Sequence, residues 1–366
     1  MNLKDTYLNE AEMLKQVPAF EGSKNVGWKS PSNIALIKYW GKRNDQLPQN
    51  PSLSFTLKNS FTETSVEYSL KKDSESQISF SFEGSEKTDF HYRIIKFTQS
   101  LYHYLPFLQQ LDLKIESLNS FPHSSGIASS ASAMSALALC YTSIQFDLFG
   151  TPDSKEKFLE KASFLSRLGS GSAARSVFGN FVLWGKSEAI PGSTDEAGIP
   201  MHFISKNGDL TLSDAILITS SDKKKVGSSM GHSQMEDHPW AEMRYEQARE
   251  NISKLITSIQ AGNDVNIINI IEKEALNLHA LMMTSAKGFS LLNDNTWKII
   301  DEIRNFRNKK KIFVAFTLDA GPNVHLIYRQ QDAAIIKDWI QKELVKYCEN
   351  GYWIDDEIGS GPEKLN

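Results

Sequence analysis

Cysteine is scarce in this chain of 366 residues, which contains only Cys140 and Cys348. The two lie far apart, and neither belongs to a CxxC motif or stands beside a cluster of histidines. Isolated cysteines provide neither the disulfide framework of a small secreted protein nor the ligand set of a structural zinc site. We therefore expect reduced, structural thiols and a cytoplasmic protein.

Long hydrophobic runs are also missing. No apolar stretch approaches the roughly 20 residues that a bilayer-spanning helix needs, so we expect no membrane partner. The first residues, MNLKDTYLNEAEMLKQVPAF, contain Asp5, Glu10 and Glu12 and lack the apolar segment of a signal peptide. They predict a short amphipathic helix that ends before Pro18.

Neither an excess of positive charge nor a metal-binding histidine motif is present. The formal net charge is −4, which gives no support to a nucleic-acid partner, so an anionic ligand must be met by local cations. The eight histidines form no HExxH motif and no helical pair with carboxylates. We expect no protein-ligated metal, and any metal would arrive with nucleotide phosphates.

The hydrophobic content, 40% of the residues, is sufficient for one large domain or two ordinary ones. Helical and strand-like segments are mixed without a steady βαβ rhythm, which favours an α+β fold. Alternating residues predict a hairpin over 62–83, a strand over 111–117, a buried strand over 214–220, and a strand, turn and strand over 311–329. Helical spacing predicts helices over 89–105, 154–167, 239–261, 264–284 and 295–308, and a last helix that stops at Gly351.

The stretch SEAIPGSTDEAGIP, at residues 187–200, is rich in glycine, proline and serine and is the best candidate for a boundary between lobes. We expect an amino-terminal extension over 1–24, a first lobe over 25–190 and a second lobe over 191–366.

The segment SPSNIALIKYWGKRND, at residues 30–45, places three cations around two aromatic residues, directly behind an apolar run. The cations are Lys38, Lys42 and Arg43. A solvated surface would explain scattered charges, but it explains less well a tight cluster at the end of a buried strand.

The segment SSGIASSAS, at residues 124–132, combines small side chains with the start of a helix. Small residues let backbone amides approach a ligand, and a helix amino terminus attracts an anion. Ser129 and Ser130 would add hydroxyls near phosphates or Mg²⁺. There is no GK[ST] and no GxGxxG motif, and a helix start built for tight packing is the alternative.

The segment RLGSGSAARSVFG, at residues 167–179, is a second turn of glycine and serine that is expected to enter a helix. Arg175 would lie one turn in, and its planar guanidinium suits a carboxylate or phosphate. A solvated arginine on a flexible turn is the alternative.

In TLDAGPNVH, Asp319 follows an apolar run and precedes a Gly-Pro turn. It either caps the turn or serves as a base or orienting group at a strand end. The basic loop DKKKVGSSMG, at residues 222–231, is either a solvated run of charge or a further anion contact.

Together these segments resemble the GHMP small-molecule kinase superfamily, and specifically its mevalonate diphosphate decarboxylase branch. NIALIKYWGKRN, FPHSSGIASSASA, GSGSAARSVFGNF and LDAGPN follow the family's motifs in unchanged order, and the similarity spans roughly residues 28 to 362. The resemblance implies a two-lobed GHMP-kinase fold, with an amino-terminal lobe like domain 2 of ribosomal protein S5 and a ferredoxin-like α/β carboxyl-terminal lobe.

The resemblance also implies an ATP-dependent decarboxylation of mevalonate 5-diphosphate to isopentenyl diphosphate. Asp319 would accept or polarise the proton of the tertiary hydroxyl, and Lys38 would stabilise charge beside it. Arg175 would hold the substrate carboxylate, helped by Ser170 and Ser172.

The remaining site residues implied by the resemblance fall into two groups. The substrate-binding group comprises Tyr39, Trp40, Gly41, Lys42, Ser170, Gly171, Ser172, Ala173, Ala174, Arg175 and Ser229. The nucleotide-binding group comprises Ser124, Ser125, Gly126, Ala128, Ser129 and Ser130, with Mg²⁺ bound through ATP near the last two. Trp40 is expected to serve mainly in packing and Arg43 to be solvated. Relatives are often homodimers, so we expect one here.

Three alternatives stay open. The substrate could be mevalonate 5-phosphate, because Ser229 stands where relatives often have threonine or arginine. The enzyme could be a GHMP kinase that stops at phosphoryl transfer and has no need of Arg175. It could also be a non-catalytic sensor of a phosphorylated ligand, although a sensor has no use for Asp319 as a base.

Overall fold

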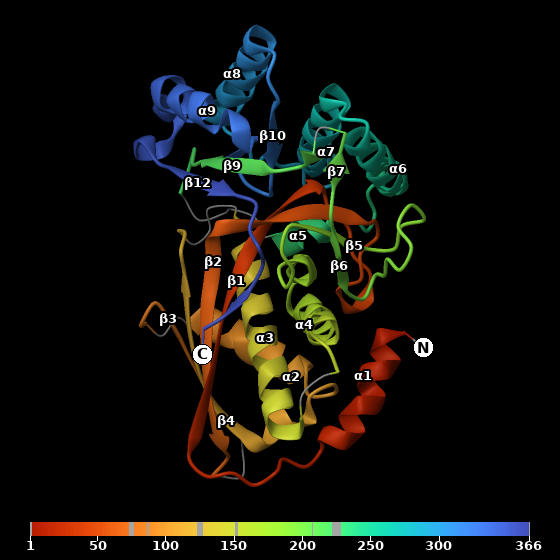
Figure 1. The fold of residues 1–366 in the computed structure, drawn as a ribbon, viewed down its shortest axis with the longest axis vertical. Helices are drawn as coiled ribbons and strands as arrows, with labels where there is room; N and C mark the ends of the chain where they lie inside the picture. Colours follow the sequence, from red (N-terminus) through yellow and green to blue (C-terminus); the bar gives the residue numbers. More distant parts are fainter. Residues whose placement is uncertain are drawn as a thin grey trace.

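The computed structural model describes residues 2–72, 77–85, 88–122, 127–150, 153–206, 208–221 and 228–365. Its helices and strands are mixed, and they form two lobes, each built on a largely antiparallel sheet (Figure 1). The expected α+β class is therefore confirmed. None of the helices within these residues is long and apolar enough to cross a bilayer.

The first lobe is organised by two long antiparallel strands, β1 (Ser23–Ile37) and β2 (Ser52–Leu70). The first half of β2 also pairs with β5 (Phe181–Trp184), and its second half pairs with β4 (Leu111–Asn119). The sheet is completed by β3 (Ile78–Phe82), β6 (Gly198–Met201) and β13 (Glu363–Lys364). β2 is 19 residues long and reaches from the far end of the first lobe to the junction with the second (Figure 1).

The hairpin expected over residues 62–83 is wrong. β3 pairs with β4 in parallel, and β4 lies between β2 and β3 in the sheet. The chain crosses from β3 to β4 through α2 (Thr88–Ser100). Alternation identified both strands correctly, but it gives no information on which strand is the partner.

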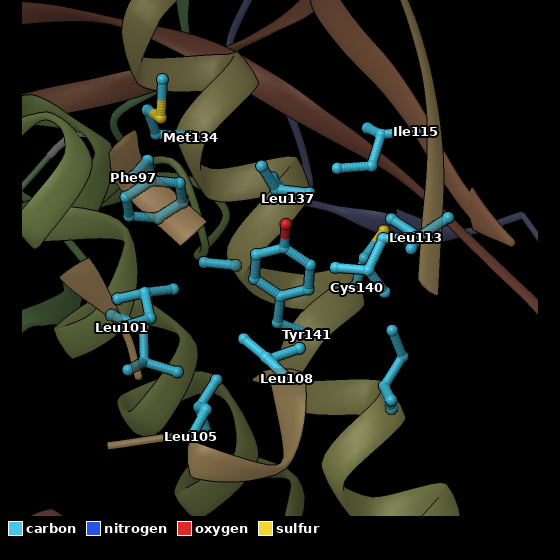
Figure 2. Packing of buried hydrophobic residues seen from close by; sticks show 14 of the residues in the cluster. Phe97, Leu101, Leu105, Leu108, Leu113, Ile115, Met134, Leu137, Cys140 and Tyr141 are labelled. Carbon is cyan, nitrogen blue, oxygen red and sulfur yellow. The ribbon is translucent and has the colours of Figure 1, made fainter. Parts of the chain in front are cut away.

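The core of the first lobe lies between its sheet and three helices, which are α2, α3 (Ser129–Phe149) and α4 (Lys155–Gly169). Figure 2 shows Tyr141 of α3 among Leu137 of α3, Leu113 of β4 and the leucines of the segment that follows α2, and its hydroxyl lies 2.6 Å from Thr98 Oγ1. Cys140 is buried in the same cluster, and burial raises the pKa of its thiol. Both cysteines are unpaired and buried, as expected for structural thiols.

The second lobe contains a four-stranded antiparallel sheet in the order β10, β11, β9, β12. Its strands are β9 (Leu212–Leu217), β10 (Val314–Leu318), β11 (Val324–Arg329) and β12 (Trp353–Glu357). The helices are α5 (Ser228–Ser233), α6 (Ala241–Gln260), α7 (Asp264–Thr284), α8 (Asp294–Lys310) and α9 (Ala333–Trp339). The short strands β7 (Ile204–Ser205) and β8 (Gly208–Asp209) form a separate pair.

These elements confirm the strand, turn and strand over 311–329 and the helices expected near 239–261, 264–284 and 295–308. The last helix is shorter than expected. After α9 the chain continues as a π-helical turn over Ile340–Leu344 and a 3₁₀ turn over Val345–Tyr347. It turns into β12 at Gly351, where a φ of 67° suits glycine.

An apolar cluster joins the two lobes. It contains Ile34, Leu36 and Phe55 from β1 and β2, together with side chains from β9, α6 and α7. Because this cluster is shared, the two sheets are fixed relative to each other by buried contacts.

The expected division at residues 190/191 stays a prediction. β6 lies beyond that division and pairs with β5 of the first sheet, and β13, near the end of the chain, pairs with β1.

The amino-terminal segment forms α1 (Leu3–Ala11) and a short 3₁₀ turn, so the helix ends before Pro18 as expected. Tyr7 is buried and packs edge-on against Phe164 of α4, with ring centroids 5.0 Å apart. Glu10 forms an ion pair with Lys161, N to O 2.9 Å, and Lys161 is only 2% exposed. Burial lowers the pKa of Lys161 to about 8, and the Glu10 carboxylate opposes this shift.

The substitution Glu10→Gln is expected to lower the free energy of unfolding by about 1–3 kcal/mol, because it leaves a buried ammonium without its counter-charge. Glu12→Gln is the control, since Glu12 forms an exposed pair with Lys15 and such pairs contribute about 0–1 kcal/mol. Urea unfolding of both variants measures the difference. Equal losses would show that α1 does not depend on the buried pair.

Candidate active site

Three charged residues from distant parts of the chain meet at the junction of the lobes. Lys38 directly follows β1, Arg175 closes the 3₁₀ turn Gly171–Arg175, and Asp319 directly follows β10. Burial lowers the pKa of both cations, and the Asp319 carboxylate acts electrostatically on each and opposes that shift. The sequence motifs that contain these residues therefore form one charged centre.

Lys38 is 1% exposed, and its Nζ has no hydrogen-bond partner among the described residues. Burial lowers the pKa of Lys38 to about 8, although the carboxylates of Asp319 and Glu274 oppose this shift. A buried ammonium that lacks a direct partner is costly. Groups of this kind gather at functional sites, because an anionic ligand supplies the missing contact.

Arg175 is not solvated. It is 2% exposed, its Nε donates to Ser54 Oγ at 2.9 Å and to Asn33 Oδ1 at 3.2 Å, and its Nη1 donates to Ser52 Oγ. These acceptors come from β1 and β2, so the first sheet fixes the plane of the guanidinium. Burial lowers the pKa of Arg175 to about 10, which leaves it a cation at neutral pH.

The expectation that Arg175 lies one turn into a helix is wrong. The segment Gly171–Arg175 is a single 3₁₀ turn and presents no helix amino terminus to an anion. A Cβ on Gly171 would lie 2.8 Å from both the Tyr39 hydroxyl and the Trp184 ring. Ala173 and Ala174, which belong to this turn, are fully buried. The aromatic rings of Tyr39 and Trp184 leave no room for a larger side chain at Gly171. The positive charge that could bind an anion here is that of the Arg175 side chain, not a helix amino terminus.

The proposed nucleotide segment is described in part. Ser124, Ser125 and Gly126 lie outside the described residues. Ala128 directly precedes α3 and has a φ of 43°, and α3 begins with Ser129 and Ser130. Ser130 Oγ lies 3.3 Å from Ser170 Oγ, which in turn lies 3.4 Å from Ser172 Oγ. The structure thus brings the proposed nucleotide segment and the proposed substrate segment together.

The wall of the site is aromatic. Tyr39 packs against Trp184 and His232, and its hydroxyl is buried without a hydrogen-bond partner in the described part of the chain. Trp40 is buried and also packs against His232, with ring centroids 4.7 Å apart. Sequence analysis missed His232, because a single histidine after a basic loop matches no motif.

His232 accepts a hydrogen bond at Nδ1 from the Gly41 N–H, at 3.1 Å. Burial lowers the pKa of His232 to about 3, and the Lys42 ammonium lowers it further, against the opposing Asp319 carboxylate. The ring is therefore neutral at physiological pH and holds the backbone between Tyr39 and Lys42. Ser229 lies in α5, the same short helix as His232, but its side chain lies outside the described part.

Lys42 and Arg43 border a cavity of about 840 Å³ beside α1. Lys42 Nζ donates to Gln46 Oε1 at 3.2 Å. Arg43 is exposed, as expected, and it also donates to Asp195 Oδ2 at 2.5 Å and to the Pro48 carbonyl. Arg43 therefore supports the loop, whereas the hydrogen-bond partner of Lys42 within the described residues is the neutral amide of Gln46.

Two family models match the chain. One describes the diphosphomevalonate decarboxylase-like N-terminal domain, over residues 30–197, and the other the mevalonate 5-diphosphate decarboxylase C-terminal domain, over residues 215–357. The diphosphomevalonate decarboxylase of Gibberella zeae is 30% identical over 325 residues, which cover 84% of this chain and 81% of that protein.

Solved structures show the same likeness. The mevalonate diphosphate decarboxylase of Staphylococcus aureus matches with a TM-score of 0.78 and 27% identity over 94% of this chain and 99% of that one. A structure of MDDEF in complex with MVAPP, AMPPCP and magnesium matches with a TM-score of 0.79 and 25% identity over 94% of this chain and 100% of that one. The expected two-lobed GHMP-kinase fold is thereby confirmed.

Gly41 is the residue of this site least able to accept a side chain. Its φ is 87°, and a Cβ would lie 2.2 Å from the Tyr245 hydroxyl. Gly22 has a φ of 71° with open space around it, so Gly22→Ala measures the backbone strain alone. Gly41→Ala is expected to cost about 1–3 kcal/mol more than Gly22→Ala, measured by urea unfolding. Equal costs would mean that Tyr245 moves away freely.

Proposed function

Because this chain belongs to the diphosphomevalonate decarboxylase family, we propose that it catalyses the ATP-dependent decarboxylation of mevalonate 5-diphosphate to isopentenyl diphosphate. Carbon dioxide, ADP and phosphate are the other products. The observation that carries the proposal is the meeting of Lys38, Arg175 and Asp319 at the junction of the lobes. The MDDEF neighbour, bound to MVAPP, AMPPCP and magnesium, supports the same substrates.

Asp319 is the proposed base. It is partly buried at the end of β10, and its carboxylate interacts electrostatically with the cations of Lys38 and Arg175. It accepts the proton of the tertiary hydroxyl, whose oxygen then takes the terminal phosphoryl group of ATP. Lys38 supplies positive charge at the oxygens on which negative charge develops, and its burial strengthens that interaction.

Arg175 is the proposed partner of the substrate carboxylate. Since Nε and Nη1 are held by β1 and β2, Nη2 is the part of the fork that faces a ligand. When phosphate leaves the tertiary carbon with the bonding electron pair, the bond from the neighbouring carbon to the carboxylate breaks. Its electrons form the new double bond, and carbon dioxide departs. A carboxylate held in a fixed plane has the orientation that this elimination requires.

ATP and Mg²⁺ fit the residues at the start of α3. The hydroxyls of Ser129 and Ser130 are hard oxygen donors, which Mg²⁺ accepts alongside nucleotide phosphates. Among the described residues, no group of three or more His, Cys, Asp or Glu side chains is placed to hold a metal ion. We propose that magnesium enters with ATP, as in the neighbour bound to AMPPCP and magnesium, and when bound it would neutralise phosphate charge.

Tyr39, Lys42 and the Gly41 backbone form the proposed contact for the distal phosphates, with Ser229 as a further contact. The buried Tyr39 hydroxyl and the Lys42 ammonium both have donor capacity for an anion. Mevalonate 5-phosphate is the alternative substrate, because it would use the same residues with fewer contacts. We also propose that the protein is a cytoplasmic homodimer, by analogy with its family.

The proposed reaction is tested by incubating the protein with Mg-ATP and either mevalonate 5-diphosphate or mevalonate 5-phosphate, while recording ADP and CO₂ together. We expect equal amounts of both products with the diphosphate alone, and at least about a 1,000-fold loss in Asp319→Asn because the base is removed. Products from the monophosphate alone would indicate the other decarboxylase. ADP without CO₂ would indicate a kinase, and no turnover a sensor.

The pH dependence of kcat/KM reports the free enzyme. Since the pKa of Lys38 is about 8, its ammonium is present below that pH and lost above it. We therefore expect kcat/KM to fall as the pH rises through about 8. In Lys38→Arg the overall rate should be lower, but this alkaline decline should disappear, because arginine stays charged. A decline retained in Lys38→Arg would assign it to another group.

A further inference from the structure

The backbone of Lys38 is held by side chains from the other lobe. Lys38 directly follows Ile37, the last residue of β1, so its peptide groups have left the strand ladder while the residue stays buried. Buried peptide groups need hydrogen-bond partners. Here the partners come from α6, α7 and the segment before β2.

Glu274 of α7 is at the centre of this arrangement. Its Oε2 accepts the Lys38 N–H at 2.9 Å and an Arg244 Nη2 hydrogen at 2.7 Å. Its Oε1 accepts from Arg244 Nη1 at 3.0 Å and from Asn251 Nδ2 at 2.7 Å. The Glu274 side chain is fully buried, and that of Arg244 is 3% exposed.

Arg244 of α6 binds both Glu274 and the backbone of Lys38. Its Nη2 also donates to the Lys38 carbonyl at 3.2 Å, and Asn50 Nδ2 donates to the same oxygen at 3.0 Å. Both the N–H and the carbonyl of Lys38 are thus bonded to one buried acid–arginine pair. This geometry fixes the direction in which the side chain of Lys38 leaves the backbone.

Helix α7 also contacts Asp319, the acidic residue of the site. His279, five positions after Glu274 on α7, donates from Nε2 to the Asp319 carbonyl at 3.1 Å. The Gly321 N–H donates to that oxygen at 2.7 Å. One rigid helix therefore bonds to the backbones of Lys38, from the first lobe, and Asp319, from the second.

We propose that Glu274, together with Arg244, is a positioning residue that sets the place of the Lys38 ammonium relative to the Asp319 carboxylate. The inference rests on the proposed function, in which these two groups act on one substrate. Glu274 does not touch the substrate, and it acts only through the backbone and the electrostatic surroundings of Lys38.

The charged groups around Lys38 include Asp319 after β10, Glu274 of α7, Arg175 of the 3₁₀ turn, Asp214 of β9 and Arg244 of α6, which bonds to the Lys38 carbonyl. Glu274 raises the pKa of Lys38 against the lowering effect of burial. Removing its charge would lower that pKa further, so less of the ammonium form would remain at neutral and alkaline pH.

Glu274→Gln tests the inference, because glutamine is of similar size and removes the charge. We expect kcat to fall by about 10- to 100-fold, as for a misplaced catalytic group, with KM for both substrates changed less than about threefold. The alkaline decline of kcat/KM should also move to lower pH, a shift that a general loss of stability does not produce.

Glu272→Gln is the matched control. Glu272 lies on the same helix, is 6% exposed and pairs with Arg307 at 2.5 Å, but makes no contact with Lys38. It should lose stability in urea as Glu274→Gln does, yet keep kcat within about twofold and retain the wild-type pH profile. If Glu274→Gln does not fold, Glu274→Gln with Arg244→Gln removes both charges, leaves neither unpaired, and should show the same loss of kcat.

A Glu274→Gln or doubly substituted enzyme as fast as Glu272→Gln, with an unshifted pH profile, would overturn the inference while leaving the proposed function intact. Wild-type protein that forms neither ADP nor CO₂ would overturn the proposed function and, with it, this inference.

Discussion

The burial of the Lys38 ammonium is the constraint on which the site depends. Taking a cation out of water is unfavourable unless carboxylates or ligand anions replace the lost hydration. Here the compensation comes from Asp319 and Glu274, which belong to the second lobe, whereas Lys38 belongs to the first. The Lys38 ammonium can be buried only when the two lobes are packed together. The site therefore forms at the same time as the contact between the lobes.

The apolar cluster at the junction stabilises the packing of the two lobes against each other. Side chains from β1 and β2 are buried against α6, α7 and β9, and this holds the end of β1 beside α7. Burial of such surface contributes about 25 cal/mol per Å², which stabilises the junction against the cost of the charges inside it. The side chains of Asn33, Ser52 and Ser54, which belong to β1 and β2, then accept hydrogen bonds from Arg175. In active sites, the free energy of the surrounding packing can offset the cost of keeping charged groups buried.

Much of this could be predicted from the sequence, because Lys38, Arg175 and Asp319 each stand in a contiguous motif. The α+β class and most helices followed from hydrophobic periodicity. The partner of β3 could not be predicted, because alternation is a property of one strand and pairing depends on the chain between strands. The burial of Arg175 was also unpredictable, since its acceptors in β1 and β2 are more than a hundred residues away. His232 and Glu274 were missed for a similar reason, because each acts through a backbone group of the first motif.

The two sheets also divide the chemistry between them. Arg175 takes its orientation from β1 and β2, and Asp319 takes its position from β10 and α7. The proposed reaction removes a proton at one of these residues and releases carbon dioxide at the other, on adjacent parts of one small molecule. A fixed distance between the two groups is therefore part of the mechanism. The packing of the two lobes holds that distance, and the hydrogen bond from the Lys38 peptide to Glu274 is one of the contacts between them. A substitution at this contact would alter both steps even though it touches neither the hydroxyl nor the carboxylate of the substrate.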